Sequence, residues 1–229
     1  MKAMILAAGK GERLKPLTEN CPKPLIKVRG KPLLAYHIQH LAQAGVEEIV
    51  INVSHLKDQM KAYIENNGPW GVKIHLSEEP TLLEVGGGIY QALPLLGQKP
   101  FIVVNGDVWT DYNFSTLPKE PGGLAHLVLV RNPLHHMKGD FCLKADGTVF
   151  SDPSLPTYTY SGMSVLRPEL FRYCTEGKFP LAPLFGRAIQ EQALVGEYYA
   201  GEWTDVGTYE RLQSLENALA SPYLTRKIS

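Results

Sequence analysis

The alternation of short apolar runs with helical patterns along the first half of the chain constrains its fold most strongly. Residues 48–53 form a β-branched run, and the preceding residues 33–44 place Leu34, Ile38 and Leu41 at helical spacing. Such alternation is typical of βαβ units, so it predicts a parallel sheet. The other elements expected in this half are strands at 3–6, 72–76 and 101–104 and helices at 56–66 and 88–96.

After Asp111 the pattern becomes richer in strands. The elements expected there are strands at 126–130, 141–143 and 158–166, a hairpin turn at 146–147, and helices at 168–173, 183–192 and 209–220. Residues 221–229 have no period, and we expect them to fray as a flexible tail. A chain of 229 residues without repeat or linker favours one α/β domain over 1–220, with a mixed sheet flanked by helices. It divides into a half over about 1–111 and a smaller, β-rich half over about 112–220.

Charge and hydropathy exclude several classes of protein. The 23 basic and 23 acidic residues give a formal net charge of zero, which argues against a nucleic-acid partner. The apolar run 3–8 is too short for a signal peptide. No run approaches the roughly 20 apolar residues of a membrane span. We therefore expect a cytoplasmic protein with neither a membrane nor a nucleic-acid partner.

A glycine loop (residues 6–14, LAAGKGERL) follows the first expected strand directly. Gly9 and Gly11 lack the Cβ atoms that would keep backbone N–H groups from phosphate oxygens, and Lys10 and Arg13 add positive charge. The loop matches neither the P-loop pattern nor the dinucleotide fingerprint. Taken alone, it is better explained as an ordinary turn that carries two solvated basic residues.

Lys23 lies between Pro22 and Pro24. The two prolines restrict the backbone, which predicts an extended and stiff mount for the lysine. Such a mount suits a lysine that must reach a fixed phosphate, while a proline-rich surface loop is the alternative.

Two aspartates follow strand-like runs and are candidate metal ligands. Asp107 comes just after the run 101–104, in Asn-Gly-Asp-Val, and Asp205 lies in Trp-Thr-Asp-Val-Gly-Thr. Open α/β sheets bind ligands at the carboxyl ends of their strands, and Mg²⁺ prefers carboxylate oxygens. Each aspartate alone could instead form a turn or cap a helix. Asp111 is a less favoured alternative ligand.

A triple-glycine segment (residues 84–88, EVGGG) precedes the helix expected at 88–96. Its backbone can approach a flat or anionic group closely, which suits recognition of a nucleobase edge. A flexible hinge is the alternative.

Together, the glycine loop and the following Pro-Lys-Pro-Leu resemble the sugar nucleotidyltransferase family, the sugar 1-phosphate pyrophosphorylases. The resemblance runs from Met4 to about Tyr209. It implies a Rossmann-like (GT-A-type) fold with a nucleotide half and a sugar half. It also implies that Lys23 and Arg13 are catalytic and that Asp107 and Asp205 hold Mg²⁺. The residues that it places on the nucleoside triphosphate are Ala8, Gly9, Lys10, Gly11, Arg13, Glu79, Gly86, Gly87 and Asn105.

The sugar half matches the family less closely. The resemblance places Gly139, Asp140, Tyr160 and Gly162 on the sugar. Long members carry a Glu-Lys-Pro segment where this chain has Leu-Pro-Thr at 155–157, and many carry a hydroxyl residue at the position of Val85. His135 and His136 are not expected to hold a metal, because adjacent side chains point in different directions.

The resemblance implies that a sugar 1-phosphate oxygen attacks the α-phosphorus of UTP and that pyrophosphate leaves. Within the family, the short chain with its LEVGGGI, HHMKGDF and WTDVGT segments most resembles the members that act on N-acetylmuramate 1-phosphate, a substrate of bacterial cell-wall recycling, which implies this sugar partner. Mannose, glucose or heptose 1-phosphate with GTP or dTTP is the alternative within the class. From other classes, a GT-A glycosyltransferase and a non-catalytic nucleotide-sugar sensor remain open.

Overall fold

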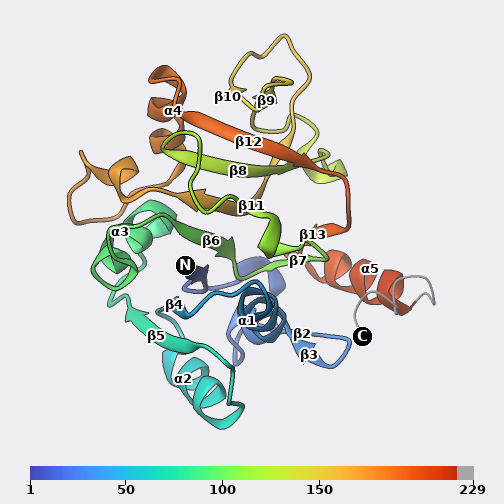
Figure 1. The fold of residues 1–229 in the computed structure, drawn as a ribbon. Coiled ribbons are helices and arrows are strands. Elements are labelled where there is room, and N and C mark those ends of the chain that lie inside the picture. Colours follow the sequence, from blue (N-terminus) through green and yellow to red (C-terminus); the bar gives the residue numbers. More distant parts are fainter. Residues whose placement is uncertain (221–229) are drawn as a thin grey trace.

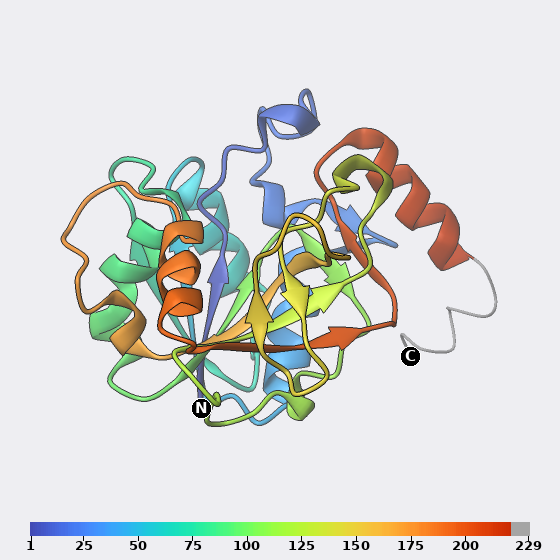
Figure 2. The same cartoon turned by 90° about the horizontal axis from the view of Figure 1, so that it is seen from above.

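The computed structural model describes residues 1–220, so the tail expected at 221–229 lies outside the described residues. Seven strands form one mixed sheet in the order β12-β8-β11-β6-β1-β4-β5, with helices on both faces (Figure 1). Strands from both halves of the chain share this sheet. Both views place α3 and α4 on one side of the molecule and α5 on the opposite side (Figure 2). This arrangement confirms the predicted α/β fold with a mixed sheet.

Four neighbouring strands are parallel and form the sheet of the first half: β1 (Lys2–Leu6), β4 (Glu48–Val53), β5 (Lys73–Glu78) and β6 (Phe101–Asn105). The second half adds β8 (Ala125–Val130), β11 (Thr159–Leu166) and β12 (Leu194–Tyr199). In this second group β11 runs antiparallel to both β6 and β8, and β12 runs parallel to β8.

Three two-stranded ladders lie outside the main sheet. They are β2 (Lys27–Val28) with β3 (Lys31–Pro32), β7 (Val108–Thr110) with β13 (Trp203–Asp205), and β9 (Cys142–Leu143) with β10 (Val149–Phe150). The helices are α1 (Leu33–Gln43), α2 (Lys57–Asn66), α3 (Glu84–Leu96), α4 (Ala182–Gln190) and α5 (Tyr209–Ala220). Among residues 1–220, no helix is long and apolar enough to span a membrane.

Alternate side chains of the central strands face opposite layers of helices, because successive residues of a strand point to opposite faces. On β1, Ile5 packs in a core cluster with Ile38 of α1, whereas Met4 packs in another with Ile89 of α3. Both faces are buried, which explains the near-continuous apolar runs in the sequence. A third cluster joins Leu215 of α5 to residues near the glycine loop.

The strands and helices expected in the first half are all present, but three local predictions, two in this half and one in the second, are wrong. The triple-glycine segment does not precede α3; it forms the first turns of the helix, which begins at Glu84. Lys23 is not extended, because Lys23–Leu25 is a 3₁₀ turn closed by the hydrogen bond from Ile26 N to Lys23 O. The helix expected at 168–173 is a short 3₁₀ turn, Pro168–Phe171.

The sequence analysis also missed β12. This strand contains Gly196, which lowers strand propensity. The glycine is needed because a Cβ atom there would come within 2.5 Å of the Leu127 carbonyl oxygen on β8.

Candidate active site

A cleft of about 440 Å³ opens at the carboxyl ends of β1, β4 and β6, where open α/β sheets bind ligands. Four groups of residues line it. The glycine loop contributes Ala8, Gly9, Gly11 and Arg13; the strand ends contribute Asn52, Asn105 and Asp107; the segment before α3 and its first turn contribute Glu79, Glu84 and Val85; and Lys23, Lys178 and Gly207 come from elsewhere. Most of the residues predicted to contact the nucleotide therefore share one cavity.

Within the glycine loop, Gly9 and Gly11 have different surroundings. A Cβ atom on Gly9 would meet no atom within 4 Å, so its backbone is open to the cleft. Gly11 has φ of 67°, and a Cβ atom there would lie 2.7 Å from Thr18 Cγ2, so glycine is required. Lys10 is exposed and is not among the residues that line the cleft.

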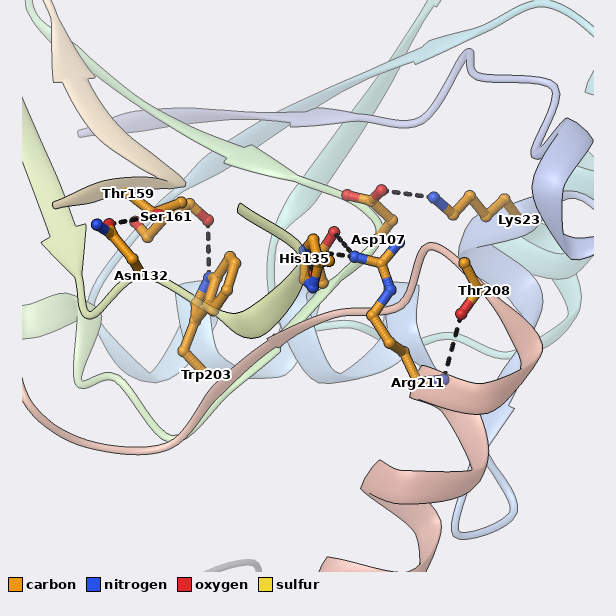
Figure 3. Close-up of polar contacts among 10 residues, drawn as sticks. Lys23, Asp107, Asn132, His135, Thr159, Ser161, Trp203, Thr208 and Arg211 are labelled. Carbon is orange, nitrogen blue, oxygen red and sulfur yellow. Dashed lines mark hydrogen bonds and ion pairs between the residues drawn. The ribbon is translucent and has the colours of Figure 1, made fainter. Parts of the chain in front are cut away.

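Lys23 points at Asp107 across the cleft. Its Nζ lies 2.5 Å from Asp107 Oδ2, and the two side chains are 13% and 29% exposed. The proline-flanked turn therefore mounts the lysine against the carboxylate that follows β6 (Figure 3).

Asp205 lies beside Asp107 because β13 pairs with β7. Val206 N donates to Asp107 O over 2.7 Å, and Asp205 stands opposite Val108 in the ladder. Two carboxylates on neighbouring strands match a Mg²⁺ site, since this ion takes one or two carboxylates and completes its shell with phosphates and waters. Asp205 Oδ1 is buried and has no hydrogen-bond partner among the described residues, with His135 Nε2 3.2 Å away as an ionic neighbour. No cluster of three or more His, Cys, Asp or Glu side chains suited to a metal occurs within residues 1–220.

Two residues that the sequence analysis missed hold Asp205. Arg211 Nη1 donates to Asp205 Oδ2 over 2.6 Å. His135 Nε2 lies 2.6 Å from the same guanidinium nitrogen and 3.2 Å from Asp205 Oδ1 (Figure 3). The neighbouring histidine, His136, points elsewhere and contacts Asp140, as expected for adjacent residues.

Gly207 brings two arginines together. A Cβ atom on this glycine would lie 2.1 Å from Arg211 Nη2 and 3.4 Å from Arg13 Nη2. The guanidinium groups from the glycine loop and from α5 therefore flank one residue of the Trp-Thr-Asp-Val-Gly-Thr motif. A glycine four positions before a first-turn helical arginine carries no recognisable signal in a single sequence.

Asp111 has a structural role in the connection between β12 and β13. Its Oδ1 accepts hydrogen bonds from the hydroxyl of Tyr199 and from Glu202 N. These contacts tie it to that connection.

The triple glycines seat another part of the chain. A Cβ atom on Gly86 would lie 2.6 Å from the ring of Phe179, and one on Gly87 would lie 2.2 Å from Gly177 O. Gly87 N donates to Phe179 O, and Phe179 N donates to Leu83 O. The strap (residues 177–180) that these contacts hold presents Lys178 to the cleft, with its Nζ 3.6 Å from Glu84 Oε1. Packing of the strap is thus a reason for these glycines that is separate from base recognition.

The four residues expected at the sugar lie in different surroundings. Gly162 is beside the cleft, because a Cβ atom there would lie 2.6 Å from Asn105 Nδ2. Gly139 instead abuts Asn132 and Thr157. Asp140 Oδ2 accepts a hydrogen bond from Tyr160 N. The hydroxyl of Tyr160 faces Ser164, and its ring packs against Phe185 of α4, so this side chain points into the core and not into the cleft.

Comparisons with known proteins agree with this geometry. Residues 2–121 match the family model described as nucleotidyl transferase. An N-acetylmuramate alpha-1-phosphate uridylyltransferase of Neisseria meningitidis serogroup B is 45% identical over 97% of this chain and 100% of its own length. A protein of the same name from Caulobacter vibrioides is 33% identical over 95% of this chain and 96% of its own.

Solved structures show the same fold. A UDP-glucose pyrophosphorylase complexed with UDP-glucose superposes with a TM-score of 0.78 at 16% identity, over 96% of this chain and 98% of that one. HddC from Yersinia pseudotuberculosis complexed with GMP-PN gives 0.76 at 22% identity, over 95% and 99%. Because these identities are low, the structures establish the architecture alone. The family model and the full-length relatives carry the assignment further, and they show that this chain belongs to the nucleotidyl transferase family.

Proposed function

We propose that this protein transfers the uridylyl group of UTP to N-acetylmuramate 1-phosphate, forms UDP-N-acetylmuramate and releases pyrophosphate. The observation that carries the proposal is the similarity to the meningococcal relative, which extends through both halves of the chain. The cleft supports it, because Arg13, Lys23 and Asp107 line one cavity beside Asp205.

The reaction follows from these groups. An oxygen of the sugar 1-phosphate forms a bond to the α-phosphorus of UTP, while the bond from that phosphorus to the bridging oxygen of pyrophosphate breaks. The attacking oxygen is already anionic at neutral pH, so the step needs no general base. Catalysis then depends on positioning and on charge stabilisation. Mg²⁺, which Asp107 and Asp205 would hold, supplies positive charge beside the phosphates when bound.

The chain's own cations neutralise the remaining charge. Lys23 stands at the carboxylate that follows β6, and Arg13 reaches Gly207 beside Arg211. A guanidinium can hold two phosphate oxygens at once. Each group would have to stabilise the transition state by a few kcal/mol, which corresponds to about two to three powers of ten in rate.

N-acetylmuramate differs from N-acetylglucosamine by a lactyl ether that ends in a carboxylate. Recognition of this carboxylate requires a cation or a free N–H group. The turn at 134–140 supplies candidates, because Lys138 is exposed there and His135 of the same turn lies beside Asp205. A site built to pair the carboxylate rejects the sugar that lacks it by orders of magnitude, since its donors are left unsatisfied.

The test is pyrophosphate release with UTP, dTTP, GTP or CTP against the 1-phosphates of N-acetylmuramate, N-acetylglucosamine, mannose and glucose. We expect the highest kcat/KM for UTP with N-acetylmuramate 1-phosphate, by roughly 10² or more over N-acetylglucosamine 1-phosphate. Equal values for these two sugars, or a preference for GTP with mannose 1-phosphate, would reject the substrate and leave the reaction class in place. A protein that consumes UDP-sugars without releasing pyrophosphate would instead be a glycosyltransferase.

A further inference from the structure

Asn52 is a buried residue of the cleft to which the reaction above gives no role. It lies near the end of β4 and is 4% exposed. Its Oδ1 accepts a hydrogen bond from Ala7 N over 2.7 Å, and its Nδ2 donates to Glu79 Oε1 over 2.7 Å. One side chain therefore joins the start of the glycine loop to the carboxylate that precedes α3.

Glu79 extends this connection to the other end of the cleft. It is 4% exposed, and its Oε2 accepts a hydrogen bond from Leu83 N over 3.0 Å, directly before α3. Its own backbone is fixed as well, since Glu79 N donates to Val53 O and Ser54 Oγ donates to Glu79 O. Among the ion pairs of residues 1–220, none involves Glu79. Both carboxylate oxygens are thus spent as acceptors toward neutral donors.

The third glycine of the triple-glycine segment makes room for this pair. A Cβ atom on Gly88 would lie 2.5 Å from Glu79 Oε1 and 3.1 Å from Asn52 Nδ2. Any larger residue there would push the carboxylate away from the asparagine. The requirement for glycine at this position therefore has a physical cause, although glycine lowers helix propensity.

We propose that Asn52 is a positioning residue which, through Glu79, keeps the glycine loop in register with the segment before α3, so that one nucleotide reaches both. The inference rests on the proposed function and on the expectation from the sequence that the glycine loop holds the phosphates of UTP while the segment before α3 flanks its base. The distance between the base and the α-phosphorus is set by the nucleotide. Two halves of a site must match it to within about 0.5 Å for productive binding.

The connection from Ala7 through Asn52 and Glu79 to Leu83, called the brace below, predicts a specific pattern of binding free energies. A ligand that touches one half of the cleft gains nothing from the register, whereas a ligand that touches both halves gains the advantage of a linked, preorganised site. Loss of the brace should therefore weaken UTP more than either uridine or inorganic triphosphate.

The experiment measures the dissociation constants of UTP, uridine and inorganic triphosphate by calorimetry, with Mg²⁺ present, for the wild type and for Asn52→Ala. We expect UTP to bind the variant at least tenfold more weakly, with uridine and triphosphate within about threefold of the wild type. Equal weakening of all three would make Asn52 a general structural residue. Loss of uridine binding alone would make it a base contact, and unchanged UTP binding would remove any role; each result overturns the proposal.

A second pair of variants separates the brace from overall folding. Gly88→Ala places a methyl group against Glu79, whereas Gly186→Ala in α4 meets no atom within 4 Å. We expect Gly88→Ala to weaken UTP binding at least tenfold and Gly186→Ala to leave it unchanged. Asn52→Ala combined with Gly88→Ala should bind UTP no more weakly than either single variant, because both remove the same contact. Additive losses contradict the brace. A wild type that binds no UTP contradicts the proposed function itself.

Discussion

Lys23 and Asp107 form a close ion pair across the cleft, with 2.5 Å between Nζ and Oδ2, although 84 positions separate them in the chain. The lysine comes from a 3₁₀ turn after the glycine loop, and the aspartate follows β6. Both side chains are largely sheltered from water, so their interaction is screened less than that of a surface pair. The pair joins the proposed charge-neutralising residue to a proposed magnesium ligand.

Replacing Lys23 by alanine should lower kcat by a factor on the order of 10² or more, because charge that develops at the transferred phosphate loses its cation. Steady-state kinetics at saturating UTP and Mg²⁺ provide the measurement. Lys15→Ala is the matched control, since Lys15 pairs with Glu12 on the surface of the same region. A higher KM with unchanged kcat would make Lys23 a ground-state binding residue instead.

Asp107→Asn and Asp205→Asn should each remove most turnover while the protein stays folded, because a neutral amide holds Mg²⁺ poorly. A magnesium titration of the rate tests this, with circular dichroism to check folding. Asp111→Asn is the control. Its carboxylate ties Tyr199 to Glu202 N, so this change should lower stability and leave magnesium activation intact. If either of the first two variants turns over at the wild-type rate, that residue is not a ligand.

Tyr160→Phe should leave the KM for the sugar 1-phosphate within about twofold of the wild type, since the hydroxyl contacts Ser164 and the ring packs on Phe185. The lost hydrogen bond should cost about 1 kcal/mol of stability. Urea denaturation and substrate titration measure the two effects separately. A tenfold rise in the KM would show that the hydroxyl reaches the sugar during turnover.

His37 should make the protein less stable in acid. This side chain of α1 is fully buried, and its Nε2 has no hydrogen-bond partner among residues 1–220. Burial lowers its pKa to about 4, an effect to which the nearby His40 adds. In the unfolded chain His37 is protonated below its ordinary pKa of 6.5, whereas in the folded protein it stays neutral until the pH falls to about 4. The free energy of unfolding therefore falls as the pH drops through this window, by roughly 3 kcal/mol for this group.

Urea denaturation at pH 7 and pH 4.5 tests this expectation. His37→Gln should flatten the dependence on pH, whereas the exposed His55→Gln should not change it. An unchanged slope in His37→Gln would assign the acid sensitivity to other groups.

Regular periodicity is what allowed the fold to be predicted. The β-branched run in β4 and the spacing of Leu34, Ile38 and Leu41 in α1 are local signals, and burial on both sheet faces makes them strong. The strand β12 was not predicted because it contains Gly196, a residue that is required there by the close approach of a carbonyl group of the neighbouring strand. The carbonyl belongs to a residue about seventy positions away, so the residues around Gly196 in the sequence do not reveal the requirement.

The residues of the candidate site also differ in how far the sequence alone reveals them. Lys23 and the glycine loop stand in short motifs, so their sequence alone drew attention to them. Asn52 is a single polar residue within a run of apolar residues in β4, and this pattern alone does not indicate a function. Its importance depends on two partners, Ala7 N and Glu79 Oε1, that come from different parts of the chain. Arg211 was missed for a different reason: it is only six positions from Asp205, but the single sequence does not show that the turn between β13 and α5 brings the two side chains together.

The ladder of β7 and β13 also sets an order of events during synthesis. Asp107 and Asp205 are about a hundred residues apart, and they become neighbours when β13 returns to β7. When the glycine loop, Lys23 and Asp107 have already left the ribosome, Asp205 has not yet been synthesised. Nascent chains therefore have half of the proposed metal site, and the onset of pyrophosphate release during translation reports the moment at which the carboxyl-terminal segment has closed the molecule.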